Sequence, residues 1–291
     1  MSPNPGVGCV IVAPDDRVFE GATEPPGQRH AEVAALDAAG GAARGATVYV
    51  TLEPCAHTGR TGPCADALIA AGVTRVVVGI QDPDVHVAGQ GIARLRDAGV
   101  KVDVLHDHDV AHDLRAYVTH RRLGRPFVTI KLAMTTDGRT VAEGGQWITG
   151  PEARADGHRL RAENDAILVG ANTVRVDDPQ LTTRDAPGPD PLRVVLGRAP
   201  ADAKVHPCAE VAGDLDAVLH DLAARGVTSL LVEGGERTAR AFHDAGLVDE
   251  YVFYVADTTP DRLAPLWDLD IVDVAQIGND VRVTLAPKAR A

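Results

Sequence analysis

The sequence predicts an α/β protein of two domains. At 291 residues the chain is longer than one hydrophobic core usually serves, so two domains of ordinary size are expected. Along the chain, short runs rich in β-branched residues alternate with Ala-rich segments whose apolar residues recur with helical period. This alternation is typical of layered α/β domains.

Composition disfavours several classes of protein. No stretch approaches the roughly 20 apolar residues of a membrane span, and we find no charged-then-apolar leader, so we expect a soluble, cytoplasmic protein. The 41 acidic and 29 basic residues give a net charge of −12 without basic clusters, which disfavours nucleic acid. A small phosphorylated substrate could still be held by a few Arg side chains. Four cysteines favour metal binding or catalysis over disulfides.

The first part of the chain contains seven clear segments. Predicted strands are 7–12, 47–52, 75–80 and 102–105, and predicted helices are 30–40, 64–72 and 91–99. Gly40, Gly72 and Gly99 end these helices, where left-handed C-terminal caps are expected. A basic helical segment at 114–124 ends at Gly124 before a proline. We therefore place the domain boundary there, which gives domains 1–124 and 125–291.

A second set of strands follows this boundary, with helices between them. The predicted strands are 127–135, 165–171, 191–197, 228–235 and 248–256, and predicted loops are 185–191 and 257–263. The sequence contains no internal repeat and no low-complexity tract.

Three residues in the first domain predict a catalytic zinc site. Such a site takes three protein ligands and leaves the fourth position for water, whose pKa the metal lowers to near neutrality. His30 opens a helix, Cys55 follows a strand, and Cys64 starts another helix. Glu32 lies two residues after the histidine and is placed to move protons between water and substrate.

Two other interpretations of these residues stay open. The cysteines could be a buried pair beside a surface His and Glu, since a lone His-x-Glu at a helix start often serves capping and solubility. A closed structural zinc site would need a fourth ligand, for which His57 is the close candidate.

The motifs resemble the bifunctional deaminase/reductase family of riboflavin biosynthesis. In the first domain these are PNPGVGCVIV (3–12), HAEVAALDAAG (30–40), TLEPCAHTGRTGPCADALIAAGV (51–73) and DP-x-x-x-x-x-G (82–89). In the second they are KLAMTTDGRT (131–140), QWITGPEAR (146–154), HRLRAENDAILVGANTVRVDDPQLTTR (158–184), LRVVLG (192–197) and LLVEGG (230–235). The long spacing from Cys55 to Cys64 distinguishes this branch from ordinary cytidine deaminases.

The resemblance implies the folds and the two reactions. It implies a three-layer, cytidine-deaminase-like domain at 1–124 and a dihydrofolate-reductase-like domain at 125–291. The first would use Zn²⁺ to remove the 2-amino group of a diaminopyrimidinone ribosylamino 5′-phosphate by hydrolysis. The second would use NADPH to reduce the ribosyl group to a ribityl chain. It also suggests a homodimer or homotetramer.

The resemblance assigns substrate roles in the first domain. Asn4 would hydrogen-bond the pyrimidine, while His57 and Arg60 would meet the phosphate. Asn4 could instead fix a turn beside proline, and Arg60 could be an ordinary surface charge.

The resemblance also assigns roles in the second domain. The substrate positions are Arg161, Leu181, Arg184 and Glu233. The cofactor positions are Trp147, Thr173, Asp177, Gly235, Glu236, Arg237 and Thr238. Trp147 could instead pack in the core. The glycine turn between strand and helix offers backbone N–H groups to a pyrophosphate, whereas no G-x-G-x-x-G fingerprint is found.

The sequence departs from the family pattern at several places. The family has an extra helix ahead of the PNP loop, which Met1 precedes here by two residues. The second domain is short between Pro200 and Asp214, and DTTPDRLAPL follows residue 256 in place of a glycine-rich segment. Gly145 replaces a serine, and Asp84 replaces an asparagine. The zinc ligands of the first domain all match the family pattern, whereas the shortened segments and Gly145 lie in the reductase domain.

Three functions therefore compete. The first is the bifunctional enzyme, and the second is a relative with only the deaminase active or with another aminated heterocycle as substrate. The third is a zinc-stabilised binding module, which would have no need of Glu32 beside the ligand histidine.

Overall fold

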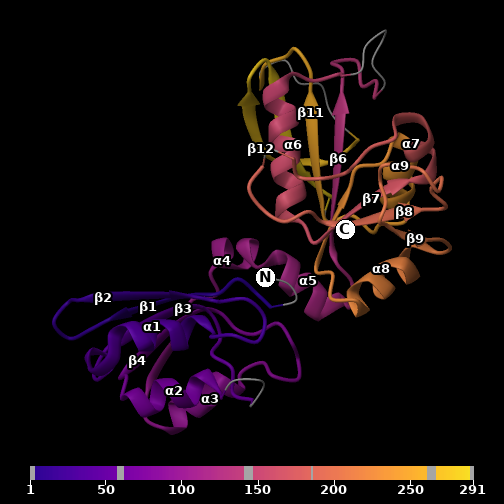
Figure 1. Cartoon of the computed structure of the whole chain (residues 1–291). Coiled ribbons are helices and arrows are strands. Elements are labelled where there is room, and N and C mark those ends of the chain that lie inside the picture. The colour runs from indigo at the N-terminus through magenta and orange to yellow at the C-terminus, as the bar shows by residue number, and fades with distance from the viewer. Residues whose placement is uncertain (1–3, 58–61, 141–146, 185, 261–266, 289–291) are drawn as a thin grey trace. The chain divides into compact units, whose positions relative to one another are not determined.

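The chain folds into two compact units. The computed structural model describes residues 4–57, 62–140, 147–184, 186–260 and 267–288. Its units are Met1–Gly124 and Arg125–Ala291, each with its own sheet and core (Figure 1). None of the described helices combines the length and the hydrophobicity that a transmembrane span requires.

The sheet of the first unit has five strands among the described residues, in the order β2-β1-β3-β4-β5. Their bounds are β1 (Gly8–Val12), β2 (Val18–Ala22), β3 (Thr47–Leu52), β4 (Arg75–Ile80) and β5 (Lys101–Val104). β1 runs antiparallel to both neighbours, whereas β3, β4 and β5 are parallel. The segments that follow β3 and β4 therefore leave the sheet at the same edge.

The helices of this unit are α1 (Ala31–Ala39), the 3₁₀ helix η1 (Gly40–Ala43), α2 (Cys64–Ala71), α3 (Gln90–Asp97), α4 (His108–Asp113) and α5 (Arg115–Leu123). Of these, α1, α2 and α3 cover one face of the sheet, and α4 contacts β4 (Figure 1). α1 packs closely on β2 because Gly21 has no side chain. A Cβ there would lie 2.3 Å from the carbonyl oxygen of Ala31.

The second unit is built on a sheet of eight described strands, in the order β12-β13-β11-β6-β10-β7-β8-β9. Their bounds are β6 (Phe127–Met134), β7 (Ala166–Gly170), β8 (Leu192–Leu196), β9 (Ala209–Val211), β10 (Ser229–Val232), β11 (Glu250–Val255), β12 (Asp270–Ile277) and β13 (Asp280–Ala286). The strands from β11 to β9 are parallel, while β12 and β13 form an antiparallel edge.

The central strands of this sheet are buried on both faces. In β7, Ala166 and Leu168 belong to one hydrophobic cluster, whereas Ile167 and Val169 belong to another. Such continuous apolar runs are expected for parallel strands between two layers of helices. The helices are α6 (Pro151–Glu163), α7 (Ala171–Asp177), α8 (Leu215–Ala224) and α9 (Glu236–Asp244).

Most predicted segments form the expected elements, with two kinds of difference. The prediction missed α4 and the strands β2, β9, β12 and β13. The left-handed cap predicted at Gly40 is wrong: its φ of 50° and ψ of −130° lie outside that region, because the chain continues into η1. Gly72, with φ 76° and ψ 33°, is the expected left-handed cap.

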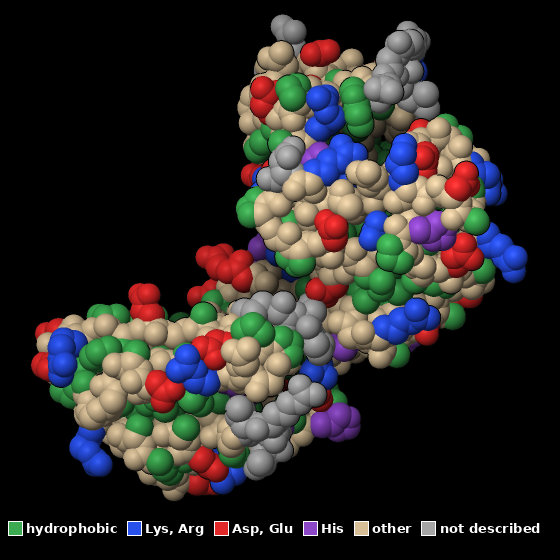
Figure 2. Space-filling model, viewed as in Figure 1, with side chains coloured by type: hydrophobic (Ala, Val, Ile, Leu, Met, Phe, Trp, Pro, Cys, Tyr) green, Lys and Arg blue, Asp and Glu red, His purple; other side chains and the backbone are tan. Residues whose placement is uncertain are grey.

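Charges are mixed over the surface. Figure 2 shows Lys and Arg side chains scattered among Asp and Glu on the visible face, with no continuous basic patch among the residues described there. This distribution agrees with the net charge of −12 and offers no polyanion-binding surface on that face.

Candidate active sites

The first unit brings His30, Cys55 and Cys64 together. Their ligand atoms all lie within 4.8 Å of one another. The His30 Nδ1 atom is 3.7 Å from the Cys55 sulfur and 3.3 Å from the Cys64 sulfur. Among the described residues this is the cluster of His, Cys, Asp and Glu that could hold a metal ion, and His57 is not part of it.

Local structure explains how three distant residues meet. His30 precedes the first turn of α1, and Cys64 is the first residue of α2. Cys55 follows β3 by three residues at the sheet edge that β4 shares. The backbone N–H of Cys64 donates to the Cys55 sulfur at 3.3 Å, so the start of α2 helps to hold that sulfur.

The geometry of the cluster fits zinc. In a tetrahedral site with Zn–S near 2.3 Å and Zn–N near 2.0–2.1 Å, ligand atoms lie about 3.5–3.8 Å apart. The distances of 3.3 and 3.7 Å from His30 Nδ1 to the two sulfur atoms are close to this spacing. Three ligands without a fourth protein group correspond to a catalytic site, which keeps one position open.

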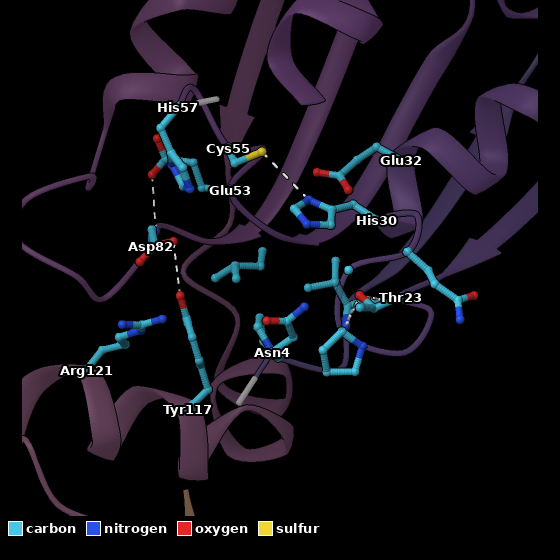
Figure 3. Close-up of a pocket in the computed structure, with 16 residues that line it drawn as sticks. Asn4, Thr23, His30, Glu32, Glu53, Cys55, His57, Asp82, Tyr117 and Arg121 are labelled. Atoms are coloured by element: carbon cyan, nitrogen blue, oxygen red, sulfur yellow. Dashed lines mark hydrogen bonds between the residues drawn. The ribbon is translucent and has the colours of Figure 1, made fainter. Parts of the chain in front are cut away.

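Electrostatics in the cluster follow from burial and from shared hydrogen bonds. The hydrogen bond from the Cys64 thiol lowers the pKa of Cys55 to about 4, and the same bond, with burial, raises the pKa of Cys64. Burial raises the pKa of Glu32 to about 7. The Glu32 side chain, in a residue only 4% exposed, points toward the His30 ring and the Cys55 sulfur (Figure 3).

A cavity of about 480 Å³ opens beside this cluster. Its volume suits a small-molecule site. The predicted residues Asn4, His30, Glu32, Cys55 and His57 all line it (Figure 3). Arg60 lies outside the described residues.

Several residues of the cavity wall were not predicted from the sequence. Glu53 and Asp82 follow β3 and β4, while Tyr117 and Arg121 come from α5 (Figure 3). The Tyr117 hydroxyl donates to an Asp82 oxygen at 3.4 Å. Glu53 and Asp82 belong to the family motifs at 51–73 and 82–89, so the sequence could have identified them as site residues. Nothing local in the sequence marks the two α5 residues.

The second unit brings Arg161 and Glu233 together in a buried ion pair. The guanidinium donates to both carboxylate oxygens, at 2.7 and 2.8 Å, and the side chains are 12% and 8% exposed. Lys131 lies 3.9 Å from the same carboxylate. Burial alone would raise the pKa of Glu233, but these two cations lower it to about 2. No role for Lys131 follows from the sequence alone, although this residue begins the motif at 131–140.

Two glycine turns meet beside this pair. Gly170 precedes α7 and Gly235 precedes α9, and their strands β7 and β10 are parallel neighbours. A Cβ at Gly170 would lie 2.7 Å from the Thr238 hydroxyl, and a Cβ at Gly235 would be 4.0 Å from that of Thr173. The predicted cofactor residues Thr173, Gly235 and Thr238 are therefore close together.

The remaining predicted residues have different surroundings. Leu181 is only 2% exposed and packs in a hydrophobic cluster. Only its backbone could therefore contact the substrate. Arg184, Asp177, Glu236 and Arg237 are exposed. Trp147 is 58% exposed, with the Arg154 guanidinium 5.0 Å from its ring centroid, so the alternative of core packing for Trp147 is wrong.

Two family descriptions match the two units. Residues 1–80 match the cytidine and deoxycytidylate deaminase zinc-binding region. Residues 126–259 match the RibD C-terminal domain. The first match includes the whole zinc cluster, and the second includes the Arg161–Glu233 pair and both glycine turns.

Relatives and solved structures cover nearly the whole chain. The chain is 43% identical to riboflavin biosynthesis protein RibD of Mycobacterium tuberculosis, over 96% of this chain and 86% of that protein. It is 39% identical to riboflavin biosynthesis protein RibD of Escherichia coli, over 87% of this chain and 82% of that protein. The structure of Acinetobacter baumannii RibD superposes with a TM-score of 0.89 at 37% identity, covering 99% of this chain and 93% of that one. The structure of a Thermotoga maritima diaminohydroxyphosphoribosylaminopyrimidine deaminase/5-amino-6-(5-phosphoribosylamino)uracil reductase superposes with a TM-score of 0.85 at 31% sequence identity. The match covers 98% of this chain and 93% of that one.

Proposed function

The chain belongs to the family of RibD riboflavin biosynthesis proteins, and from this premise we propose how its residues carry out the two reactions. The protein is a bifunctional enzyme with a zinc-dependent deaminase domain and an NADPH-dependent reductase domain. Zinc and NADPH are its cofactors.

In the deaminase, His30, Cys55 and Cys64 would hold zinc. When bound, zinc supplies Lewis-acid activation of a water molecule. Glu32 would accept a proton from the attacking water and deliver protons to the ring nitrogen and the leaving amine, a role supported by its place in the cavity wall beside the ligands. Asn4 would orient the pyrimidine, while His57 and Arg60 would bind the 5′-phosphate. The substrate is a diaminopyrimidinone ribosylamino 5′-phosphate.

In the reductase, NADPH would bind between the 165–184 region and the 230–238 turn, in preference to NADH. Backbone N–H groups at the start of α9, with Thr173, would donate to its phosphates. Trp147 would flank the nicotinamide, and Asp177, Glu236, Arg237 and Thr238 would complete the cofactor site. Arg161, Arg184, Glu233 and the backbone of Leu181 would position the ribosyl substrate.

The observation that carries this function is the His30, Cys55 and Cys64 cluster beside Glu32 in a cavity. The test measures zinc content, ammonia release from the diaminopyrimidine phosphate, and NADPH oxidation. We expect one zinc per chain, ammonia release without NADPH, and the ribityl product only with NADPH. Protein without zinc, or without ammonia release, would contradict the deaminase assignment. Ammonia release with undetectable NADPH binding would leave only the deaminase active.

Two further expectations follow from family membership. We expect a homodimer or homotetramer, which light scattering after size-exclusion chromatography measures. We expect the enzyme in the cytoplasm, where cell fractionation would place its activity.

A further inference from the structure

Glu53 holds an unusual set of hydrogen bonds. Its residue is 5% exposed, and its carboxylate accepts four backbone N–H groups. One oxygen accepts from Gly91 at 2.9 Å and Ile92 at 3.2 Å, and the other accepts from Gly89 at 2.9 Å and Asp82 at 3.1 Å (Figure 3 shows the last). The proton-transfer roles above do not use this side chain.

Three of these donors form the N-terminus of α3. The first N–H groups of a helix have no partner within it, and Gly89 has no side chain that could cap them. The Glu53 carboxylate supplies the cap from a distant part of the chain. A negative charge at this end is also favoured by the helix dipole.

The cap brings the backbone before Cys55 directly against α3. A Cβ at Gly91 would lie 1.8 Å from the carbonyl oxygen of Pro54, so only glycine fits there. The backbone between Glu53 and Cys55 is thus held in two ways: the Glu53 side chain binds the N-terminus of α3, and Gly91 of α3 packs against the Pro54 carbonyl.

Arg94 makes a second connection from α3 to both cysteine segments. Its guanidinium donates to the carbonyl of Ala56 at 3.3 Å and to the carboxylate of Asp66 at 2.8 Å. Ala56 follows Cys55, and Asp66 lies in the first turn of α2, which Cys64 begins. One helix therefore contacts the segments on which both sulfur ligands lie.

We propose that Glu53 is a positioning residue of the zinc site, because it fixes the Cys55 segment on α3 while Arg94 connects that helix to α2. The proposal rests on the zinc site of the proposed function. It assigns α3 the task of setting the distance between the two sulfur ligands. Outer-shell groups that orient metal ligands typically change metal affinity by about 10- to 100-fold when replaced.

The test is Glu53→Gln, which keeps the size of the side chain but turns an NH₂ group toward N–H donors. We expect its zinc affinity, measured by competition with a chelator, to fall about 10- to 100-fold. The visible spectrum of the Co²⁺-loaded variant should also change, since that spectrum reports ligand geometry rather than stability. Asp107→Asn is the matched control, because Asp107 caps α4 in the same unit through two N–H groups. It should leave affinity and spectrum unchanged.

Arg94→Ala keeps the proposal testable if Glu53→Gln does not fold. The Arg94 side chain is 48% exposed, so we expect this variant to fold and to lose zinc affinity by a smaller factor. If the folded variants keep wild-type zinc affinity and an unchanged Co²⁺ spectrum, this inference is wrong, while the proposed function is unaffected. A wild-type protein that binds no zinc would overturn the proposed function and the inference with it.

Discussion

At the scale of single residues, the role of Glu32 can be tested independently of the metal ligands beside it. Glu32→Gln should leave zinc bound, because the ligand atoms belong to other residues. Deamination should fall by about 10²- to 10⁴-fold, the usual contribution of a general acid–base group. Metal analysis and ammonia release measured on the same preparation check both parts. Near-normal turnover would refute the proton-transfer role, and lost zinc would show that the side chain supports the site structurally.

Glu233 provides a residue-scale prediction for the second unit. A carboxylate whose pKa is lowered by folding stabilises the protein above its unfolded-state pKa, and this contribution disappears as pH falls through the folded-state value. For Glu233 that window runs from 4.5 down to about 2. The free energy of unfolding of the wild type, measured by thermal unfolding at a series of pH values, should therefore fall across this window by on the order of 3 kcal/mol. Glu233→Gln should lack this contribution.

The control for this titration is Glu163→Gln. Glu163 forms an ion pair with Arg159, but its side chain is 50% exposed, so it should contribute little. Parallel profiles for the wild type and Glu233→Gln would mean that the Arg161 and Lys131 charges do not hold this carboxylate ionised.

At the scale of elements, the sequence predicted the central strands better than the edges. β4 and β7 are continuous apolar runs, which parallel strands buried on both faces require. β2 and β12 lie at sheet edges and expose many residues, so their pattern resembles that of loops. Burial depends on neighbours that the local sequence does not contain.

The residues of the candidate site were predictable from the sequence only where a local motif marks them. His30, Cys55 and Cys64 could be found because their motif is compact and chemically distinctive. Tyr117 and Arg121 reach the cavity from α5, and only the folded chain places that helix beside the Asp82 segment.

The packing of α1 on β2 gives an element-scale prediction. Gly21→Ala would place a Cβ within 2.4 Å of both the Ala31 carbonyl oxygen and the Ala35 nitrogen, so the helix must move. We expect a loss of stability of about 1–3 kcal/mol. Zinc affinity should also fall, because His30 lies at the start of this helix. Both tryptophans lie in the second unit, so unfolding is best followed by circular dichroism.

Gly41→Ala is the comparison for this variant. Gly41 lies in η1, just after α1, and a Cβ there meets nothing within 4 Å. It should unfold and bind zinc like the wild type. Equal behaviour of the two variants would show that close packing at Gly21 does not position the helix.

At the scale of the whole molecule, each proposed reaction is contained in one unit. The zinc cluster and its cavity use residues of Met1–Gly124, and the Arg161–Glu233 pair with the glycine turns uses residues of Arg125–Ala291. Each unit also has its own hydrophobic core. A defect in one proposed site should therefore leave the other chemically intact.

This separation can be measured with His30→Ala. The variant should release no ammonia, because it lacks a metal ligand, yet it should oxidise NADPH at a near wild-type rate when given the deaminated intermediate directly. Glu233→Gln should show the reverse, since its change lies in the second unit. An equimolar mixture of the two should convert the diaminopyrimidine phosphate to the ribityl product, because the intermediate formed by one protein can diffuse to the other. If His30→Ala also lost the reduction step while remaining folded, the two activities would depend on each other, and the division of chemistry between the units would be wrong.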